Sequence, residues 1–319
     1  MRKVTAGNAK PRIYGHRGAR GEVPENSLTG LDHLLGVGVN AAEIDVQNSA
    51  DGVTIVWHDH NLDADMIRDA AGAWLNSNAT LVVDTNFSEL RMLDFGALRE
   101  GSAQAAAFPQ QVSIEGTRIA SLDDVCQWLK PLDDFTLNIE IKSFADRSDW
   151  GDGPAQLAQS VVSLIEKYDL VTRMIVSSFD WRVLSETKAI NADISRGYLS
   201  YLDRPNAPMD PNIIDGSAWM DGLRLRDHDN SLPQAIADIG GSVWAPYFED
   251  LTAQDLARAH DLGLVVNVWT VNKAADMKRM ADMGVDGLIT DYPTLATQVF
   301  GPEGHSTDGL PLEKVGLGG

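Results

Sequence analysis

Charged residues alternate with apolar ones at two places in this 319-residue chain. Glu43 and Asp45 flank Ile44, so both carboxylates would project to the same face of an extended strand. Glu140 and Lys142 repeat the spacing around Ile141. Carboxylates that converge from neighbouring strands repel one another unless a cation neutralises them, and oxygen ligands of this kind suit Mg²⁺ or Ca²⁺. The spacing predicts one divalent metal ion; a salt-bridged group at a barrel mouth is the other interpretation.

Two histidines could supply proton transfer near neutral pH. His16 stands beside Arg17 in a glycine-flanked stretch, and His58 precedes Asp59. Each histidine alone is as easily explained by a turn or a structural His–Asp pair. Together with the carboxylates and two cations, Arg17 and Lys142, they form a set that phosphoryl transfer requires: neutralised phosphate oxygens, an activated nucleophile and a proton for the leaving group.

Short β-branched apolar segments alternate with helical patterns along most of the chain, which is typical of parallel α/β folds. The predicted strands are Arg12–Tyr14, Ala42–Val46, Leu137–Ile141, Met174–Ser177, Ile194–Leu199, Ser242–Pro246, Leu264–Trp269 and Gly287–Thr290. The predicted helices are Ser27–Leu35, Leu122–Leu129, Ala155–Tyr168, Trp181–Asn191, Leu232–Ile239, Ala253–Leu262 and Ala274–Met283. Eight strands with intervening helices predict a TIM (β/α)₈ barrel, whose catalytic groups gather at the C-terminal ends of the strands.

The chain is expected to form one catalytic domain over residues 1–300. The stretch from about 48 to 118 is too long for a simple crossover and predicts a small inserted subdomain after the second strand. It begins with a hairpin-like turn at Asp51-Gly52. Residues 301–319 are glycine-rich and without periodicity, so we expect a loosely ordered tail.

Composition narrows the classes of function. A net charge of −20 argues against a nucleic-acid partner and against stable association with anionic membranes. Cys126 is the only cysteine, which excludes an intrachain disulfide and a cysteine-based zinc site. The first ten residues lack an apolar signal core, and no apolar run is long enough to span a bilayer. These features predict a cytoplasmic protein with a small-molecule partner.

The order of motifs resembles the glycerophosphodiester phosphodiesterase family over about residues 12 to 300. The matching stretches are GHRG at 15–18, PENS at 24–27, EIDVQ at 43–47, DGVTIVWHD at 51–59, SELRMLDFG at 88–96, IEIK at 139–142, SSF at 177–179, VWTVN at 268–272 and GVDGLITDYP at 284–293. The resemblance implies a TIM barrel with a small insertion after the second strand, in agreement with the strand count above.

The resemblance also implies roles for individual residues. It makes Glu43, Asp45 and Glu140 the metal ligands and His16 and His58 the general acid/base pair. It makes Arg17 and Lys142 the phosphate-binding cations. It implies that Glu25 and Asn26 brace the first loop, and that Trp269 forms an apolar wall beside the glycerol or the alcohol.

One segment departs from the family pattern. Residues 62–74 replace a Leu-Asp-Arg-Thr-Thr-like continuation and belong to the insertion that we expect to overhang the site, which leaves the preferred leaving group open. Asp63 and Asp65 in this segment would disfavour anionic head groups. Other candidates have less motif support. His60 is expected to be peripheral, Asp286 and Asp291 structural, and Trp57, Trp128, Trp150, Trp181, Trp219 and Trp244 core or interface residues.

The activity implied is metal-dependent cleavage of a glycerophosphodiester to sn-glycerol 3-phosphate and an alcohol. A glycerol hydroxyl would attack phosphorus to give a cyclic phosphate, which water then opens. Two alternatives remain open at this point. One is a phospholipase D-like enzyme of the same superfamily, acting on lysophospholipids or sphingomyelin. The other is a non-catalytic barrel that binds phosphorylated ligands.

Overall fold

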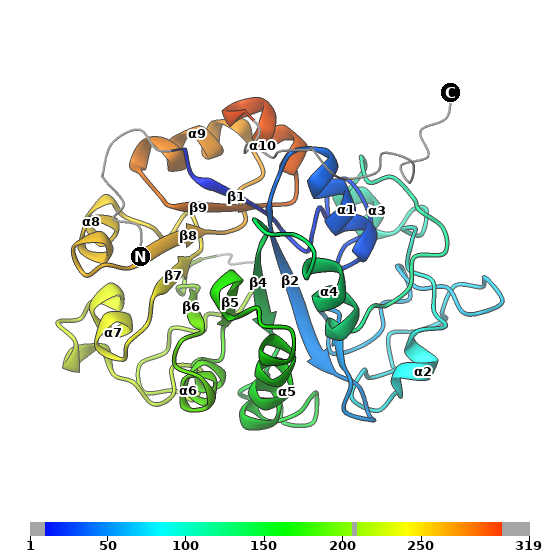
Figure 1. Ribbon diagram of the computed structural model, residues 1–319, viewed down its shortest axis with the longest axis horizontal. Helices are drawn as coiled ribbons and strands as arrows, with labels where there is room; N and C mark the ends of the chain where they lie inside the picture. Colours follow the sequence, from blue (N-terminus) through cyan, green and yellow to red (C-terminus); the bar gives the residue numbers. More distant parts are fainter. Residues whose placement is uncertain (1–9, 206–208, 302–319) are drawn as a thin grey trace.

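The predicted TIM barrel is present in the computed structural model, which describes residues 10–205 and 209–301. Eight parallel strands form the barrel: β1 (Arg12–Gly15), β2 (Ala41–Asn48), β4 (Thr136–Ile141), β5 (Met174–Ser178), β6 (Ser195–Ser200), β7 (Val243–Pro246), β8 (Val265–Val268) and β9 (Gly287–Thr290). β1 pairs with both β2 and β9, which closes the sheet on itself (Figure 1). All eight strand predictions are confirmed, with ends that differ by at most two residues.

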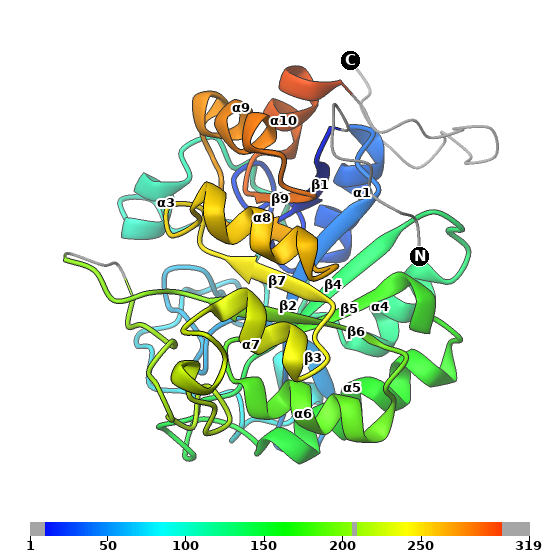
Figure 2. The same cartoon turned by 90° about the vertical axis from the view of Figure 1, so that its left-hand side faces the viewer.

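Helices surround the strands (Figures 1 and 2). They are α1 (Leu28–Gly36), α4 (Leu122–Leu129), α5 (Pro154–Lys167), α6 (Trp181–Ile190), α7 (Leu232–Asp238), α8 (Ala253–Asp261), α9 (Ala274–Met283) and α10 (Pro293–Phe300), with short 3₁₀ turns at Val171–Arg173 and Leu225–Asp227. Local sequence explains several starts. Ser121 and Asp124 form a reciprocal capping box at α4, which satisfies two backbone N–H groups. α10 was not predicted, although Pro293 in its first turn is a typical helix-start residue.

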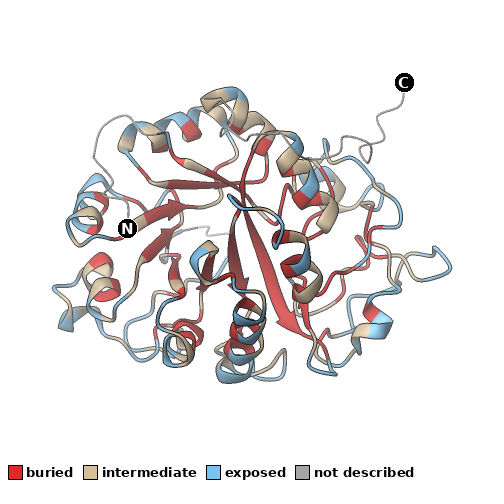
Figure 3. Cartoon of the chain, viewed as in Figure 1, coloured by how far each residue is buried: buried red, intermediate tan, exposed pale blue. Residues whose placement is uncertain are grey.

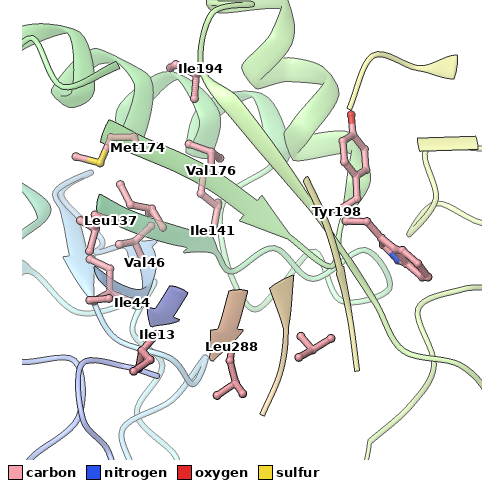
Figure 4. Packing of buried hydrophobic residues seen from close by; sticks show 14 of the residues in the cluster. Ile13, Ile44, Val46, Leu137, Ile141, Met174, Val176, Ile194, Tyr198 and Leu288 are labelled. Carbon is pink, nitrogen blue, oxygen red and sulfur yellow. The ribbon is translucent and has the colours of Figure 1, made fainter. Parts of the chain in front are cut away.

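The main core lies between the strands and the surrounding helices, because alternate strand residues point outward from the barrel. Ile44 and Val46 of β2, Leu137 and Ile141 of β4, and Val176 of β5 belong to this layer (Figure 4). The strands are almost fully buried, whereas the helices expose their outer faces (Figure 3). A smaller apolar cluster, which includes Tyr14, Ile175 and Ile289, fills the barrel interior. The alternation leaves the inward positions free to carry polar groups.

The long segment between β2 and α4 extends from one side of the barrel (Figure 1). Its strand β3 (Thr54–Val56) pairs antiparallel with the end of β2 and follows the predicted turn. The segment also holds two short helices, α2 (Phe87–Leu90) and α3 (Ala103–Ala107). It has its own apolar cluster, around Trp57, Ile67 and Phe95, so its shape is supported independently of the barrel core.

The remaining expectations concern the chain end and the membrane. Residues 302–319, which hold all but one residue of the expected tail, lie outside the described residues. Among the described helices, none has the length and apolar character needed to cross a bilayer.

Candidate active site at the barrel mouth

A cavity of about 810 Å³ lies at the C-terminal ends of the barrel strands. Charged and polar side chains line one side of it: His16, Arg17, Arg20, Glu43, His58, Glu140 and Lys142. Apolar side chains line much of the rest: Phe144, Trp150, Phe179, Leu199, Met209, Trp219 and Trp269. The structure therefore brings the predicted metal ligands, histidines and phosphate-binding cations together: Asp45 is buried and does not itself line the cavity, but its carboxylate lies within 4.8 Å of those of Glu43 and Glu140.

Strand register assembles the three carboxylates. Asp45 on β2 lies opposite Glu140 on β4, and Glu43 is two residues before Asp45 on the same inward face. One oxygen from each of Glu43, Asp45 and Glu140 lies within 4.8 Å of the others. Glu43 Oε1 and Asp45 Oδ1 are buried and accept no hydrogen bond from any described residue. Buried anionic oxygens without donors, in a set of three carboxylates, fit a divalent cation such as Mg²⁺ or Ca²⁺.

The three carboxyl groups differ in their electrostatics. Burial, with the charges of Asp45 and Glu140, raises the pKa of Glu43 well above its ordinary value. Burial also raises the pKa of Glu140, and the charge of Lys142 offsets this only in part. Burial would likewise raise the pKa of Asp45, but the positive charges of His58, Arg17 and Lys142 lower it overall. The site therefore brings three carboxyl groups together in a buried place, where their ionised forms need nearby cations for stabilisation.

Both predicted phosphate-binding cations are already paired with carboxylates. Arg17 Nη1 donates to Glu25 Oε1 at 2.8 Å, and Arg17 Nε is 3.2 Å from Asp45 Oδ2. Lys142 Nζ is 2.6 Å from Glu140 Oε1 and 3.7 Å from Asp45 Oδ1. The carboxylates raise the pKa of Lys142 despite its burial. Arg17 and Lys142 thus stay charged at the edge of the cavity.

The first loop holds the carboxylates in place. Asn26 Nδ2 donates to Asp45 Oδ2 at 3.0 Å, and the Asp45 backbone N–H donates back to Asn26 Oδ1 at 3.1 Å. Glu25 bridges Arg17 and Arg20. Arg17 and Asn26 both adopt left-handed backbone conformations, with φ of 48° and 52°. Such conformations are rare for non-glycine residues and concentrate at functional sites. Gly15 permits the tight loop, since a Cβ there would lie 1.8 Å from the Gly18 carbonyl oxygen.

Each histidine of the pair has an aspartate on the same ring nitrogen. His16 Nδ1 is 2.5 Å from Asp291 Oδ1, and its Nε2 is 3.8 Å from Glu43 Oε2. His58 Nδ1 is 2.5 Å from Asp59 Oδ1. A carboxylate on Nδ1 fixes the ring and leaves Nε2 for proton exchange. Burial and the charges of Arg17 and Lys142 lower the pKa of His58 well below its ordinary value.

Asp291 was expected to have a structural role, but it contacts a candidate catalytic group directly. It lies just after β9 and accepts from Asn272 Nδ2 at 2.6 Å as well as contacting His16. The charge and hydrogen bond of His16 lower the pKa of Asp291, although burial acts against this. Its position after the last strand was the one available sequence signal, because barrel-strand ends carry functional groups.

The apolar side of the cavity is an aromatic assembly. Trp269 makes edge contacts with Phe179 and Tyr247, with ring centroids 5.2 and 5.3 Å apart. Its Nε1 donates to the Ala245 carbonyl at 2.8 Å, which satisfies its only polar group. Trp269 thus lies in the cavity wall, and its place beside the glycerol or the alcohol stays a prediction.

Two tryptophans expected in the core or an interface line the cavity instead: Trp150 and Trp219. Trp150 belongs to the loop between β4 and α5, which also contributes Phe144 and Arg147 to the cavity wall. His60 stacks on Trp150 with ring centroids 3.7 Å apart and planes 3° apart. His60 is not among the cavity-lining residues, so the structure gives it a supporting position.

Residues 62–74 do not line the cavity, and Leu62, Met66 and Ile67 are buried in the cluster of the inserted segment. Asp63 is likewise absent from the cavity wall, although Gln104 links it to the cavity residue Arg20. The effect of this segment on the leaving group stays a prediction.

Several cavity residues were not predicted as site residues, among them Arg20, Asn138 and Ser177. Asn138 carried a usable signal, because it precedes Glu140 by two positions and so shares its inward face. Ser177 also carried a signal, because it begins the matching SSF stretch at 177–179, but only the register of β5 against β4 places it opposite Glu140.

Comparisons with known proteins agree with this geometry. A family model described as "Glycerophosphoryl diester phosphodiesterase family" matches residues 16–295. A solved structure from Silicibacter pomeroyi DSS-3, provisionally named a glycerophosphoryl diester phosphodiesterase, is 36% identical with a TM-score of 0.79, covering 92% of this chain and 94% of that one.

Two further similarities are more distant. A curated glycerophosphodiester phosphodiesterase of Caldanaerobacter subterraneus is 25% identical and covers 89% of this chain and 95% of its own length. A phosphodiesterase of Oleispira antarctica, solved with its product sn-glycerol-3-phosphate, is 21% identical with a TM-score of 0.65, covering 91% of this chain and 96% of that one. At this identity the Oleispira structure supports the fold alone.

Proposed function

The chain belongs to the glycerophosphoryl diester phosphodiesterase family, and from this membership we propose that it hydrolyses glycerophosphodiesters to sn-glycerol 3-phosphate and an alcohol in a metal-dependent reaction. One observation carries the proposal: three buried carboxylates, two of which have an oxygen without a hydrogen-bond partner among the described residues, lie together at the cavity that also holds two Asp-paired histidines. A small-molecule substrate is consistent with a cavity of about 810 Å³, and the −20 net charge disfavours nucleic acid.

Glu43, Asp45 and Glu140 would hold the Mg²⁺ or Ca²⁺ ion. Such an ion, when bound, offsets negative charge at the phosphate and makes a nearby hydroxyl more acidic. Arg17 and Lys142 lie at the same edge and bind phosphate oxygens in this proposal, with Arg20 next to them. Glu25 and Asn26 keep the first loop in the geometry that this requires.

His16 and His58 divide the two proton transfers between them. One takes the proton of a glycerol hydroxyl as its oxygen bonds to phosphorus, and the other donates a proton to the alcohol oxygen as its bond to phosphorus breaks. A cyclic phosphate results. Water then opens the ring with the two roles reversed, and sn-glycerol 3-phosphate is released. Asp291 and Asp59 keep each Nδ1 occupied, so each Nε2 is the exchanging atom.

The decisive experiment measures release of glycerol 3-phosphate from glycerophosphocholine by purified protein with Mg²⁺ or Ca²⁺. EDTA should stop the release. His16→Ala should lower kcat by about 10²- to 10⁴-fold, which is the usual contribution of general acid–base catalysis. His260→Ala is the matched control, because His260 also contacts an aspartate, Asp286, but lies outside the cavity wall. Full activity of His16→Ala would overturn the mechanism.

A phospholipase D-like reaction on lysophospholipids is the second candidate. The size of the cavity and its apolar side, with Phe179, Leu199 and Trp219, favour it. Comparing lysophosphatidylcholine or sphingomyelin with glycerophosphocholine as substrates separates the two activities. Ligand binding without turnover of any diester would instead support a non-catalytic barrel. A cytoplasmic location remains part of the proposal, which cell fractionation would test.

A further inference from the structure

Two buried polar side chains on the wall of the cavity each hold an atom with no partner within the described part of the chain. Asn138 on β4 is 3% exposed and Ser177 on β5 is 1% exposed. Asn138 Oδ1 and Ser177 Oγ have no hydrogen-bond partner there. Buried polar atoms are nearly always hydrogen-bonded, so an exception needs an explanation. Because both residues line the cavity, a bound group could provide the missing partner.

Register places these two side chains beside the carboxylates. Asn138 lies opposite Glu43 on β2, and Ser177 lies opposite Glu140 on β4. Residues paired in this way point to the same face of the sheet, so all four side chains face the barrel interior. Asn138 is therefore next to Glu43 across the β2–β4 pairing, and Ser177 is next to Glu140 across the β4–β5 pairing.

The chemistry of the pair differs from that of the rest of the polar side. An amide and a hydroxyl carry no net charge, and together they offer both donors and acceptors. A phosphate would be matched by cations, which Arg17 and Lys142 already provide. A neutral hydroxyl, which donates one hydrogen bond and accepts others, is the complementary partner for Asn138 and Ser177.

We propose that Asn138 and Ser177 form a subsite that binds the terminal hydroxyl of the glycerol portion of the substrate. This inference rests on the proposed function. The glycerol hydroxyl adjacent to the phosphate-bearing carbon remains next to the carboxylates for attack on phosphorus. The terminal hydroxyl lies one carbon further away and reaches the neutral pair.

The subsite has a consequence for substrate choice. A lysophospholipid esterified at the terminal position lacks this hydroxyl and adds an acyl chain at a buried point of the wall. Sites built to hydrogen-bond a hydroxyl reject analogues without it, because their own polar groups are left unpaired. The subsite therefore selects deacylated glycerophosphodiesters.

The test compares two substrates that differ only in this hydroxyl. One is glycerophosphocholine. The other is its deoxy analogue, in which the terminal hydroxyl is replaced by hydrogen and the attacking hydroxyl is retained. Asn138→Ala and Ser177→Ala are the variants. Ser200→Ala is the matched control, because Ser200 is also 1% exposed on a barrel strand but accepts a hydrogen bond from Trp244 Nε1.

The wild type should prefer glycerophosphocholine over the deoxy analogue in kcat/KM. Asn138→Ala should reduce this preference by about tenfold or more, since it slows the parent substrate and leaves the analogue nearly unchanged. Ser177→Ala should reduce it in the same direction. Ser200→Ala should leave the preference unaltered even if it lowers thermal stability.

Calcium titration by calorimetry provides a readout besides activity. Asn138→Ala and Ser177→Ala should bind Ca²⁺ within about twofold of the wild type if they contact the substrate alone. Equal slowing of both substrates, or a tenfold loss of Ca²⁺ affinity, would overturn the subsite. A wild type that turns over no glycerophosphodiester would instead overturn the proposed function, so the two failures are distinguishable.

Discussion

The two sides of the cavity contrast in how far their polar groups are satisfied. On the charged side, Glu43 and Asp45 each bury an oxygen with no hydrogen bond from the described residues. On the aromatic side, the polar atom of Trp269 is hydrogen-bonded to Ala245, and its ring packs against Phe179 and Tyr247. The aromatic side is complete without a ligand, whereas the charged side is not. The proposed chemistry therefore lies on the side where carboxylates are held close together, and the packed aromatic residues define the shape of the other side.

The charged side is also built from a different part of the chain. β1, β2, the loop after β3 and β4 supply its carboxylates, cations and histidines, with Asp291 after β9 as the one distant addition. The aromatic side draws on the loop after β4 and on the strands and loops from β5 to β8. This separation predicts that substitutions on the two sides affect different kinetic parameters.

The largest effect is expected from Asp45→Asn. The substitution removes one charge from the proposed metal site and should lower kcat/KM by on the order of 10³ or more, because electrostatic stabilisation is usually the largest catalytic contribution. Calcium titration should show weakened binding. Asp63→Asn in the inserted segment is the control and should be nearly silent. Retention of both activity and Ca²⁺ affinity in Asp45→Asn would remove the contrast between the two sides.

A smaller effect is expected on the aromatic side. Trp269→Ala should raise KM more than it lowers kcat, with a change in kcat/KM of about 10- to 100-fold, because the ring shapes the cavity without contributing charge. Trp269→Phe should recover much of the loss through its remaining apolar surface. Steady-state kinetics measures both variants. A decrease in kcat without a change in KM would show that Trp269 acts in the chemical step, as is proposed for the charged side.

The smallest effect concerns the stability of the metal-free protein. The pKa of Glu43 is higher in the folded protein than in the unfolded chain. Its contribution to the free energy of unfolding is therefore fully present below the unfolded pKa and is lost as pH rises through the folded pKa. Glu43→Gln removes that loss and should increase the free energy of unfolding by on the order of 1 kcal/mol at neutral pH. The glutamine side chain is uncharged, yet its oxygen could still accept from the Arg17 backbone N–H, as the Glu43 carboxylate does.

Denaturant unfolding in EDTA across a pH series checks this expectation. The difference between Glu43→Gln and wild type should be small near pH 4 and grow as pH rises through the raised pKa of Glu43. An advantage of the same size at every pH would show that packing, rather than charge, explains it. Addition of Ca²⁺ should reverse the order, because the wild type gains binding energy from the ion.

Much of the fold was predictable because the strands and helices follow from patterns in neighbouring residues of the sequence. All barrel strands except β6 contain β-branched apolar residues, and α4 and α9 begin and end where their periodicity predicted. The pairs Glu43/Asp45 and Glu140/Lys142 followed from the two-residue repeat of a strand. These features need no knowledge of distant contacts.

Other features depended on contacts that sequence spacing does not encode. His16 and Asp291 are 275 residues apart and meet only because β1 pairs with β9 when the barrel closes. Trp150 lines the cavity from the loop after β4, and Leu62, Met66 and Ile67 pack into the separate apolar cluster of the inserted segment.

By itself, the sequence determined which residues alternate inward along each strand, and hence that carboxylates, histidines and cations would face a common mouth. Tertiary structure alone decided which of them touch. Barrel closure and strand register set Asp291 against His16, and they set Asn138 and Ser177 beside Glu43 and Glu140. The physical reason is that side-chain direction is a property of local backbone geometry, whereas contact between strands depends on how the whole sheet pairs and closes.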